Sequence, residues 1–462
     1  MLTLILNCKT ILDAQQTLTT IDPIITAIEL RVDYLENHTL ETINSLCQQA
    51  TVPVILTLRN QQDGGRFDSS EIERHQLLIK LSEAKAEYID IEDHVPTRVL
   101  DRVLRNEIKV IRSHHDFQAT TEDLNELWQS LQHPGVSQYK IATKANSSLD
   151  SLRMLLFSKK HHNLTAHCMG EDGLLSRYLA TLVNTPFIFS QSSVNPVMEY
   201  IPTIKDFKEF QLQSINQKTK LYALIGDPVR HSPGMQFHNR YFKEQNINAR
   251  YIHIRLQKDE LNTFLSQANE LGIYGLSVTI PLKQALTEYV STDLKAINTV
   301  RLMPAIQCCN TDGIGTINAL LEKTTLQNKS ILILGAGGTA NGIADALSRA
   351  SFSCQLCFLN RTASKAKQLA RRHGGTTMTD DISHLNFDVI INTLPPQAYN
   401  DSSLLEKIAR WIDPQTTVMD VNYHPKHTPL LKLANTKQAT TVFGERLFYH
   451  QAIEQQNFWR RT

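Results

Sequence analysis

The chain has 462 residues, which predicts about two to four domains, and an apolar fraction of 41%, which is enough for ordinary buried cores. Its formal net charge of +1 speaks against nucleic acid or an anionic membrane as a partner, because either would favour a basic surplus on one face. Since the sequence has no run of 18 apolar residues and no basic leader, and its seven cysteines are scattered, we expect a soluble cytoplasmic protein with small-molecule ligands and no membrane span.

The first part of the chain alternates short apolar runs, which are typical of buried strands, with stretches long enough for helices, such as 72–86 and 147–158. Eight alternating units of this kind predict a small (β/α)8 barrel, a TIM barrel, over residues 1–212. The predicted strands are 2–6, 27–32, 54–58, 88–91, 108–111, 138–142, 164–168 and 187–189.

A polar stretch at 205–220 predicts a helix and then the junction to a second α/β unit with two lobes. The first lobe, 219–323, has predicted strands at 221–225, 249–254 and 275–279, and the C-terminal helix 444–462 returns to it. In the second lobe, 324–443, a strand runs straight into GAGGTA, and the order strand, glycine-rich turn, helix predicts a Rossmann fold. Cys354 and Cys357 form a CxxC pair inside a predicted buried strand, which favours packing over redox chemistry.

Ionisable side chains follow the predicted strands of the first half, at the ends where catalytic groups converge in such a barrel. Taken singly, each of them is more often a surface, cap or ion-pair residue. The informative feature is that such residues recur at the ends of five successive predicted strands and in the loop after the seventh. They are Glu29, Arg31, Asp33, Arg59, Asp63, Asp90, Glu92, His114, His115, Asp116, Lys140 and Arg177.

Lys140 stands in the apolar strand QYKIA, where burial and neighbouring cations can release an ammonium proton near neutral pH. A free amine can attack a ketone to form a Schiff base, which draws electrons from the adjacent carbon so that a proton there can be removed. His115 is a fitting base because histidine titrates near neutral pH, and Glu92 could orient it. Arginines at the same rim fit a substrate carboxylate.

These residues lie in motifs that resemble type I 3-dehydroquinate dehydratase over residues 1–210: ELRVDYL, LTLRNQQDGGRF, IDIE, SHHDF, YKIA and EDGLLSR, in family order. The resemblance implies Lys140 as the Schiff-base lysine, His115 as the general acid and base, and Glu92 as the partner of the histidine. It also implies substrate-binding residues, namely Glu29, Arg31, Arg59 and Arg177. Val194 and Met198 stand where the family has a serine and a glutamine that help to hold the substrate.

The segment GAGGTA in the second half fits the pattern G-x-G-x-x-A. Gly335, Gly337 and the adjacent Gly338 permit a tight turn and let backbone N–H groups at the start of the following helix approach a pyrophosphate. Because the motif follows a predicted strand and precedes the helical segment NGIADALSRA, the sequence predicts a dinucleotide site here.

The choice between NAD and NADP depends on the end of the next strand, where NAD sites usually have an acidic residue. Here the strand ends in Asn360, Arg361 and Thr362, with Lys365 following. No carboxylate repels a 2′-phosphate and two cations can meet it, so NADP(H) is favoured. The alternative is that Arg361 and Lys365 only cover a helix start.

Lys283 ends the segment SVTIPLK, and Asp312 stands in CCNTDGIG. A lysine that a carboxylate keeps charged and oriented can steer a proton to the alkoxide that forms as hydride reaches a carbonyl. The alternative for this pair is a structural salt bridge between lobes.

Residues 220–462 resemble shikimate dehydrogenase through ALIGDPVRHS, GLSVTIPLK, AINT, NTDGIG, GAGG, NRT, DVNYHPKHTPL and GERLFYHQA. The resemblance implies Lys283 and Asp312 as the catalytic pair and places Gly337, Gly338, Asn360, Arg361, Thr362 and Gly444 around the cofactor. The implied shikimate contacts are Ser232, Thr279, Asn298, Tyr423 and Gln451. Gly234 replaces a family serine that grips the substrate carboxylate, and Leu394 replaces the threonine of an Asn-Ala-Thr segment.

Together the two resemblances predict a bifunctional enzyme that dehydrates 3-dehydroquinate and then reduces 3-dehydroshikimate to shikimate with NADPH, without a metal. Two alternatives stay open. The barrel could be a non-catalytic ligand-binding module, in view of the segment SVNPVM at 193–198, or the second half could be a quinate-type dehydrogenase that uses NAD, against which Arg361 speaks. The predicted partners are the two small-molecule substrates, and the sequence indicates no nucleic acid, no membrane and no particular oligomeric state.

Overall fold

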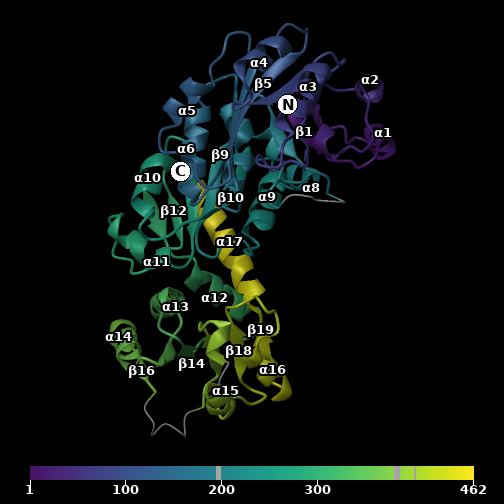
Figure 1. Ribbon diagram of the computed structural model, residues 1–462. Coiled ribbons are helices and arrows are strands. Elements are labelled where there is room, and N and C mark those ends of the chain that lie inside the picture. Colours follow the sequence, from purple (N-terminus) through teal and green to yellow (C-terminus); the bar gives the residue numbers. More distant parts are fainter. Residues whose placement is uncertain (194–198, 379–385, 400–401, 462) are drawn as a thin grey trace. The chain divides into compact units, whose positions relative to one another are not determined.

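The computed structural model describes residues 1–193, 199–378, 386–399 and 402–461 (Figure 1). It divides into two compact units. Unit 1 comprises Met1–Leu221, Asn239–Leu256 and Thr263–Gly272, and unit 2 comprises Tyr222–His238, Gln257–Asn262 and Ile273–Thr462. Across the described ranges, no helix combines the length and the apolar character needed to cross a membrane. Val194 and Met198, where the family's substrate-holding turn was expected, lie outside the described residues.

The described residues of unit 1 form a parallel eight-stranded sheet in the order β7-β6-β5-β4-β3-β2-β1-β8. The strands are β1 Leu2–Leu6, β2 Ala27–Arg31, β3 Val54–Thr57, β4 Tyr88–Glu92, β5 Lys109–Asp116, β6 Gln138–Lys144, β7 Leu164–Met169 and β8 Ile188–Ser190. The helices are α1 Ile11–Thr19, α2 Leu40–Gln49, α3 Glu71–Leu81, α4 Thr97–Val103, α5 Leu124–Leu131, α6 Ser148–Ser158, α7 Leu174–Tyr178 and α8 Ile204–Glu209. This alternation confirms the predicted barrel.

Side-chain hydrogen bonds join β7, at one end of this sheet, to the residues just before β8, at the other end. The Thr165 hydroxyl accepts from the backbone N–H of Phe187 at 3.1 Å, and the Thr185 hydroxyl donates to the carbonyl of Leu164 at 3.3 Å. These bonds bring the ends of the order together, as closure of a barrel requires.

The strands of the barrel present alternate residues to its interior and to the surrounding helices. On β6 and β7, Tyr139, Ile141, Leu164 and Ala166 pack in one apolar cluster with Leu131, Met154 and other residues of α5 and α6. Because side chains on a strand alternate with a period of two, the residues between them face the interior. Lys140 and His167 are among these interior residues.

In unit 2, strands β9 (Lys220–Gly226), β11 (Ile273–Val278), β12 (Thr299–Arg301) and β13 (Gln307–Cys309) follow one another in a sheet. Strand β12 pairs antiparallel with both of its neighbours. Helix α9 (Gly234–Glu244), strand β10 (Ala249–Arg255) and helix α10 (Leu261–Ala268) are the elements between β9 and β11 in sequence, and the short helix α11 (Leu282–Ala285) follows β11.

A second sheet of unit 2 has the parallel order β16-β15-β14-β17-β18-β19 among its described residues. Its strands are β14 Lys329–Leu334, β15 Cys354–Leu359, β16 Thr376–Thr377, β17 Val389–Asn392, β18 Thr417–Asp420 and β19 Thr440–Val442. The chain order reverses at β14, which is the arrangement of a Rossmann fold and creates a crevice at the carboxyl end of that strand. The predicted fold class is therefore confirmed.

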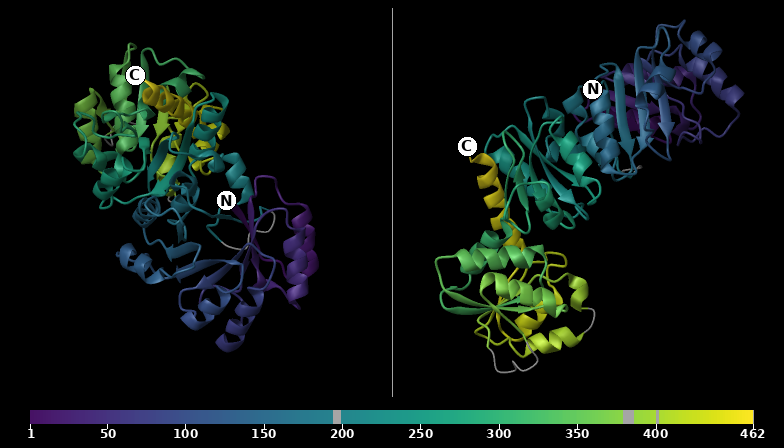
Figure 2. Two further views of the ribbon diagram at one scale, coloured as in Figure 1. Left: turned by 90° about the horizontal axis from the view of Figure 1, so that it is seen from above. Right: turned by 90° about the vertical axis from the view of Figure 1, so that its left-hand side faces the viewer.

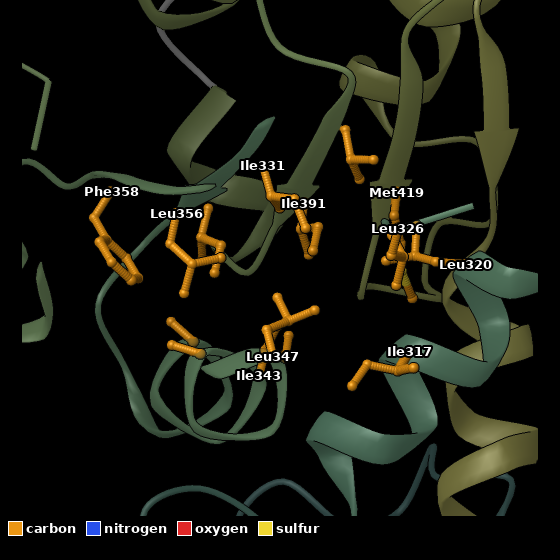
Figure 3. Close-up of a cluster of buried hydrophobic side chains, with 14 of the residues drawn as sticks. Ile317, Leu320, Leu326, Ile331, Ile343, Leu347, Leu356, Phe358, Ile391 and Met419 are labelled. Carbon is orange, nitrogen blue, oxygen red and sulfur yellow. The ribbon is translucent and has the colours of Figure 1, made fainter. Parts of the chain in front are cut away.

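Helices cover both faces of the Rossmann sheet (Figure 2), namely α12 Asp312–Leu321, α13 Gly338–Arg349, α14 Ala363–His373, α15 Ser402–Ala409 and α16 Pro429–Thr436. On one face Ile331 and Ile391 meet Ile343 and Leu347 of α13 (Figure 3). On the other face, Leu332 belongs to a separate cluster. Burial on both sides explains why these strands are continuous apolar runs. Cys354 and Cys357 of β15 pack into opposite clusters, as expected for structural cysteines.

Helix α17 (Gly444–Arg460) connects the end of the Rossmann sheet to the sheet of the same unit that contains β11 and β12. The Trp459 indole donates to the carbonyl of Val300 on β12 at 2.9 Å, and Gln455 accepts from the Ser277 hydroxyl on β11 at 2.9 Å. Both contacts are buried, so this helix fixes Gln451, one turn earlier, against the lobe that carries Asn298 and Asp312.

Candidate active sites

Lys140 lies inside the barrel, surrounded by side chains from other strands. Its Nζ is 3.4 Å from Oε1 of Glu29 on β2 and 3.3 Å from Oδ2 of Asp90 on β4. It also lies 4.2 Å from the ring centroid of Phe189 on β8. Only 6% of Lys140 is exposed, so the amine is held in a fixed place with little bulk water around it.

Asp90 joins Lys140 to the Arg59 guanidinium. Arg59 Nη2 is 3.0 Å from Asp90 Oδ2, and the Ser113 hydroxyl donates to Asp90 Oδ1 at 2.6 Å. Burial alone would raise the pKa of Asp90, but the charges of Arg59 and Lys140 and the Ser113 hydrogen bond lower it to about 2. Asp90 is therefore an anion at neutral pH, beside the Lys140 nitrogen.

His115 follows Ser113 on the interior face of β5, and its Nδ1 lies 3.4 Å from Arg59 Nη1. Burial, followed by the positive charges of Arg59 and Lys140, holds the pKa of His115 well below its ordinary value. A neutral imidazole is the form that can accept a proton.

Glu92 has different partners from the one we predicted. Its Oε1 accepts from Arg59 at 3.1 Å and its Oε2 accepts from Arg74 of α3 at 2.8 Å. Both Glu92 and His115 thus contact the Arg59 guanidinium, which takes the place of the direct contact that the resemblance implied. Charge pairing explains the geometry, because a buried carboxylate is stable only when its oxygens are paired.

The two remaining predicted arginines are anchored differently. Arg31 forms a forked ion pair with Asp33, at 2.9 and 2.7 Å. Arg177 donates from Nε to the carbonyl of Cys168 at 3.0 Å, and burial lowers its pKa to about 10. It remains a cation at neutral pH.

In unit 2, Lys283 Nζ donates to Oδ2 of Asp312, as predicted. The same Nζ is 3.5 Å from the Thr339 hydroxyl at the start of α13. Asn298 Nδ2 donates to the other oxygen of Asp312 at 2.7 Å, and Asp312 is 5% exposed. The structure thus brings a lysine, a carboxylate and an amide together beside the amino-terminal end of the Rossmann helix.

Of the other predicted shikimate contacts, Gln451 lies beside this group. Gln451 Oε1 accepts from the Thr311 hydroxyl at 3.3 Å, so it adjoins the Asn298 and Asp312 cluster. The Ser232 hydroxyl hydrogen bonds to Tyr423, and burial raises the pKa of that tyrosine. Thr279 directly follows β11, where its backbone N–H donates to the carbonyl of Ile225 at 2.9 Å.

The glycine-rich turn has the geometry of a dinucleotide cradle. Gly335 has φ +109°, and a Cβ there would come within 2.4 Å of the Thr393 hydroxyl. Gly337 caps α13, and a Cβ there would meet nothing within 4 Å, so the surface above this helix start is open. These features allow backbone N–H groups to approach a phosphate.

The predicted 2′-phosphate residues follow β15, which pairs directly with β14 up to Leu334 and Leu359. Asn360 donates from Nδ2 to the carbonyl of Thr362 at 3.1 Å, which shapes the turn. Arg361, Thr362 and Lys365 are exposed. Gly444 is explained by packing, because a Cβ there would lie 2.6 Å from the carbonyls of residues 421 and 422.

Three family models match the chain in sequence order: type I 3-dehydroquinase over residues 3–209, shikimate dehydrogenase substrate binding domain over 224–300, and shikimate/quinate 5-dehydrogenase over 318–403. The chain is 30% identical to a chloroplastic bifunctional 3-dehydroquinate dehydratase/shikimate dehydrogenase of Arabidopsis thaliana, with 93% of this chain and 76% of the relative covered. The chain belongs to this bifunctional family. The predicted combination of a dehydratase and a shikimate dehydrogenase in one polypeptide is confirmed.

Other related proteins are similarly distant. A shikimate biosynthesis protein of Chlamydia pneumoniae is 31% identical, with 94% of this chain and 89% of the relative covered. Among solved structures, the dehydroquinate dehydratase and shikimate dehydrogenase from S. pombe matches with 22% identity and a TM-score of 0.44, over 99% of this chain and 95% of that one.

Two departures from the family pattern have local structural consequences. Gly234 opens α9, and its N–H donates to the Ser232 hydroxyl at 3.2 Å. Leu394 contributes its backbone: its carbonyl accepts from the side-chain amides of Asn392 at 3.3 Å and Asn422 at 2.7 Å. The backbone at these positions therefore helps to hold the neighbouring polar side chains.

Sequence reasoning assigned no role to several residues of these sites, namely Asp90, Ser113, Arg74, His167 and Thr311. Asp90 had a usable signal, because it shares a face of β4 with Glu92. The contribution of Arg74 had none, because the side of α3 that meets the barrel depends on tertiary packing.

Proposed function

We propose that unit 1 dehydrates 3-dehydroquinate through an imine on Lys140 and that unit 2 reduces 3-dehydroshikimate with NADPH at Lys283 and Asp312. The supporting observation for the first step is the placement of the Lys140 amine between two carboxylates, with the neutral imidazole of His115 on the neighbouring strand. In this proposal residues 1–212 form the dehydratase, 219–323 with 444–462 form the substrate lobe, and 324–443 form the cofactor lobe.

In the dehydratase, the Lys140 nitrogen bonds to the ketone carbon and the ketone oxygen leaves as water. Glu29 and Asp90, at 3.4 and 3.3 Å, stabilise the positive charge that the iminium nitrogen carries. His115 takes the proton from the adjacent carbon, and the electron pair expels the hydroxyl group on the next carbon, which leaves as water with a proton from the imidazolium. A water molecule then hydrolyses the product imine, which frees 3-dehydroshikimate and the Lys140 amine. Arg177 suits the substrate carboxylate because its two Nη groups form a fork that matches it. Arg31 binds Asp33 through Nε and Nη2, so it would reach the carboxylate through Nη1 alone.

Borohydride trapping tests the imine. Wild-type protein incubated with 3-dehydroquinate and borohydride should gain one adduct, which peptide mapping places on Lys140. Lys140→Ala should form no adduct and lose dehydratase turnover, whereas Lys144→Ala, a change at an exposed lysine of the same strand, should keep both. Turnover by Lys140→Ala would refute the mechanism, and a wild-type barrel that neither turns over nor traps substrate would be a ligand-binding module.

For the reductase, the crevice at Gly335 to Gly338 fits a dinucleotide, and the exposed Arg361 and Lys365 fit the 2′-phosphate of NADP. When bound, the reduced nicotinamide supplies hydride to a carbonyl. Lys283, held by Asp312, carries the proton for the resulting alkoxide, and Asn298 fixes the orientation of Asp312. Ser232 and Tyr423 offer hydroxyl groups to the substrate.

A further inference from the structure

A second histidine, His167 of β7, faces the interior of the barrel beside Lys140. The neighbouring residues Ala166 and Cys168 pack outward with α5 and α6, so His167 points to the opposite side. Its ring lies 5.8 Å from that of Phe189, the same ring that Lys140 Nζ approaches to 4.2 Å. Both side chains therefore contact one aromatic residue of β8 from adjacent strands.

The strand register places His167 and His115 on opposite sides of one small residue. In the ladder, Ala142 of β6 is the partner of His115 on β5 and of His167 on β7. Ala142 lies two residues beyond Lys140 on the same face of β6, toward the carboxyl end. His115, Ala142 and His167 are thus neighbours across the three strands, and the only side chain between the two imidazoles in this register is the methyl group of Ala142.

His167 is well placed to exchange protons with substrate. It is 7% exposed, and within the described part of the chain no hydrogen bond joins its imidazole to another group. Burial, followed by the charges of Arg177 and Lys140, holds its pKa well below the ordinary value, so the ring is neutral near pH 7. A neutral imidazole has one nitrogen that accepts a proton and one that donates a proton.

We propose that His167 is a second catalytic histidine, which carries protons between the Lys140 nitrogen and the ketone oxygen while the imine forms, and leaves the carbon proton to His115. The inference rests on the proposed imine at Lys140. It assigns one imidazole to each side of the reacting ketone: His115 to the adjacent carbon and His167 to the oxygen.

The proton balance of imine formation requires such a carrier. The ammonium of Lys140 and the ketone give an iminium and one water, so two of the three ammonium protons end on the oxygen and no external proton is consumed. His167 accepts the first proton from nitrogen, the free amine bonds to the ketone carbon, and the imidazolium returns that proton to the oxygen. It then moves a second proton from nitrogen to the resulting hydroxyl as the carbon–oxygen bond breaks. His167 ends neutral, as it began.

The experiment compares His167→Gln and His167→Met with His114→Gln. His114 is the matched control because it stands on β5 but pairs with Asp93, at 2.7 Å, away from Lys140. With wild-type unit 2 present, we expect both His167 variants to lower kcat for dehydration by roughly 100-fold, the size typical of a lost proton-transfer group. They should also lose the steady-state borohydride adduct on Lys140. His115→Gln, in contrast, should keep the adduct, because its defect follows imine formation.

A substrate deuterated at the carbon next to the ketone provides the second measurement. Imine formation should become rate-limiting in the His167 variants, so the isotope effect on kcat should fall toward 1. The inference is overturned if both variants keep the adduct at the level of His114→Gln, or if activity falls only in proportion to folded protein measured by circular dichroism. Failure of the proposed function looks different, because wild-type protein itself would then trap no adduct on Lys140.

Discussion

Asn298 donates from Nδ2 to Oδ1 of Asp312 at 2.7 Å, while Lys283 donates to Oδ2, so each oxygen of this carboxylate has its own partner. The amide therefore fixes the plane of the carboxylate and, through it, the direction of the ammonium group. Asn298 itself is oriented by Thr299 and Thr311, whose hydroxyl and N–H groups donate to its Oδ1 at 2.7 and 2.8 Å.

Removing this amide should impair the reductase without abolishing it. Asn298→Ala leaves a buried carboxylate oxygen without its donor, which costs about 1–3 kcal/mol. We expect roughly tenfold lower kcat for reduction of 3-dehydroshikimate, from a misoriented Lys283. Steady-state kinetics measure this, with Asn457→Ala on α17 as the control. An unchanged kcat would show that Asn298 does not orient the pair.

Replacing Lys283 tests the proton-transfer step more directly. Lys283→Ala should lower kcat for reduction by about 100-fold or more, because a positioned acid contributes that much, while the KM for NADPH changes little. Lys323→Ala, an exposed lysine after α12, should behave as wild type. If kcat survived the first substitution, the pair would be the structural salt bridge that the sequence left open.

The strands and most of the charged site residues could be predicted, because the apolar run of a strand and the ionisable residues at its end are both visible in the local sequence. Lys140 could be identified from its apolar strand and Lys283 from its motif. Lys283 contacts Asp312 as expected, whereas the Lys140 amine contacts two carboxylates instead of the cations predicted from the sequence. The partners of Glu92 could not be identified, because Arg74 comes from a helix whose inward face is decided by packing. His167 was missed because a single polar residue in the apolar run LTAHCM gives no signal until the register with Ala142 and Phe189 is known.

Arg74 should be important for stability. It is fully buried and donates from Nη1 to Glu92 at 2.8 Å, while its other nitrogens bond Glu71 of its own helix. Arg74→Met leaves one Glu92 oxygen buried without a partner, and breaking such a pair costs about 3–5 kcal/mol. We expect a lower thermal midpoint for loss of dehydratase activity and an unchanged midpoint for the exposed change Arg102→Ala. Equal midpoints would mean that Arg59 alone suffices for Glu92.

The buried histidines make the stability of unit 1 dependent on pH. The unfolded chain binds a proton at each histidine near pH 6.5, whereas the native protein keeps the pKa of His115 and His167 well below that value. Their contribution is complete above about pH 6.5 and decreases as the pH falls, by up to about 1.4 kcal/mol per pH unit for each histidine. Asp90, with a pKa of about 2, is affected only in stronger acid.

Denaturation midpoints at pH 7 and pH 5 should therefore differ more for the wild type than for His115→Gln, because glutamine does not titrate. His253, whose pKa burial lowers to about 4, should supply part of the slope that remains. A variant slope equal to the wild-type slope would indicate that the imidazole of His115 is already protonated in the native state.

Replacing Arg361, which is exposed at the turn after β15, tests the proposed choice of cofactor. A guanidinium that pairs with a 2′-phosphate contributes about 1.5–3 kcal/mol, so Arg361→Ala should raise the KM for NADPH by roughly 10- to 100-fold. NADH has no such phosphate, so its KM should stay the same. The preference of the variant for NADPH over NADH should therefore be smaller than that of the wild type. Arg410→Ala, an exposed arginine after α15, controls for a general loss of positive charge in unit 2. Equal effects on both cofactors would mean that Arg361 only covers the start of α14, and a wild-type preference for NADH would favour the quinate-type alternative.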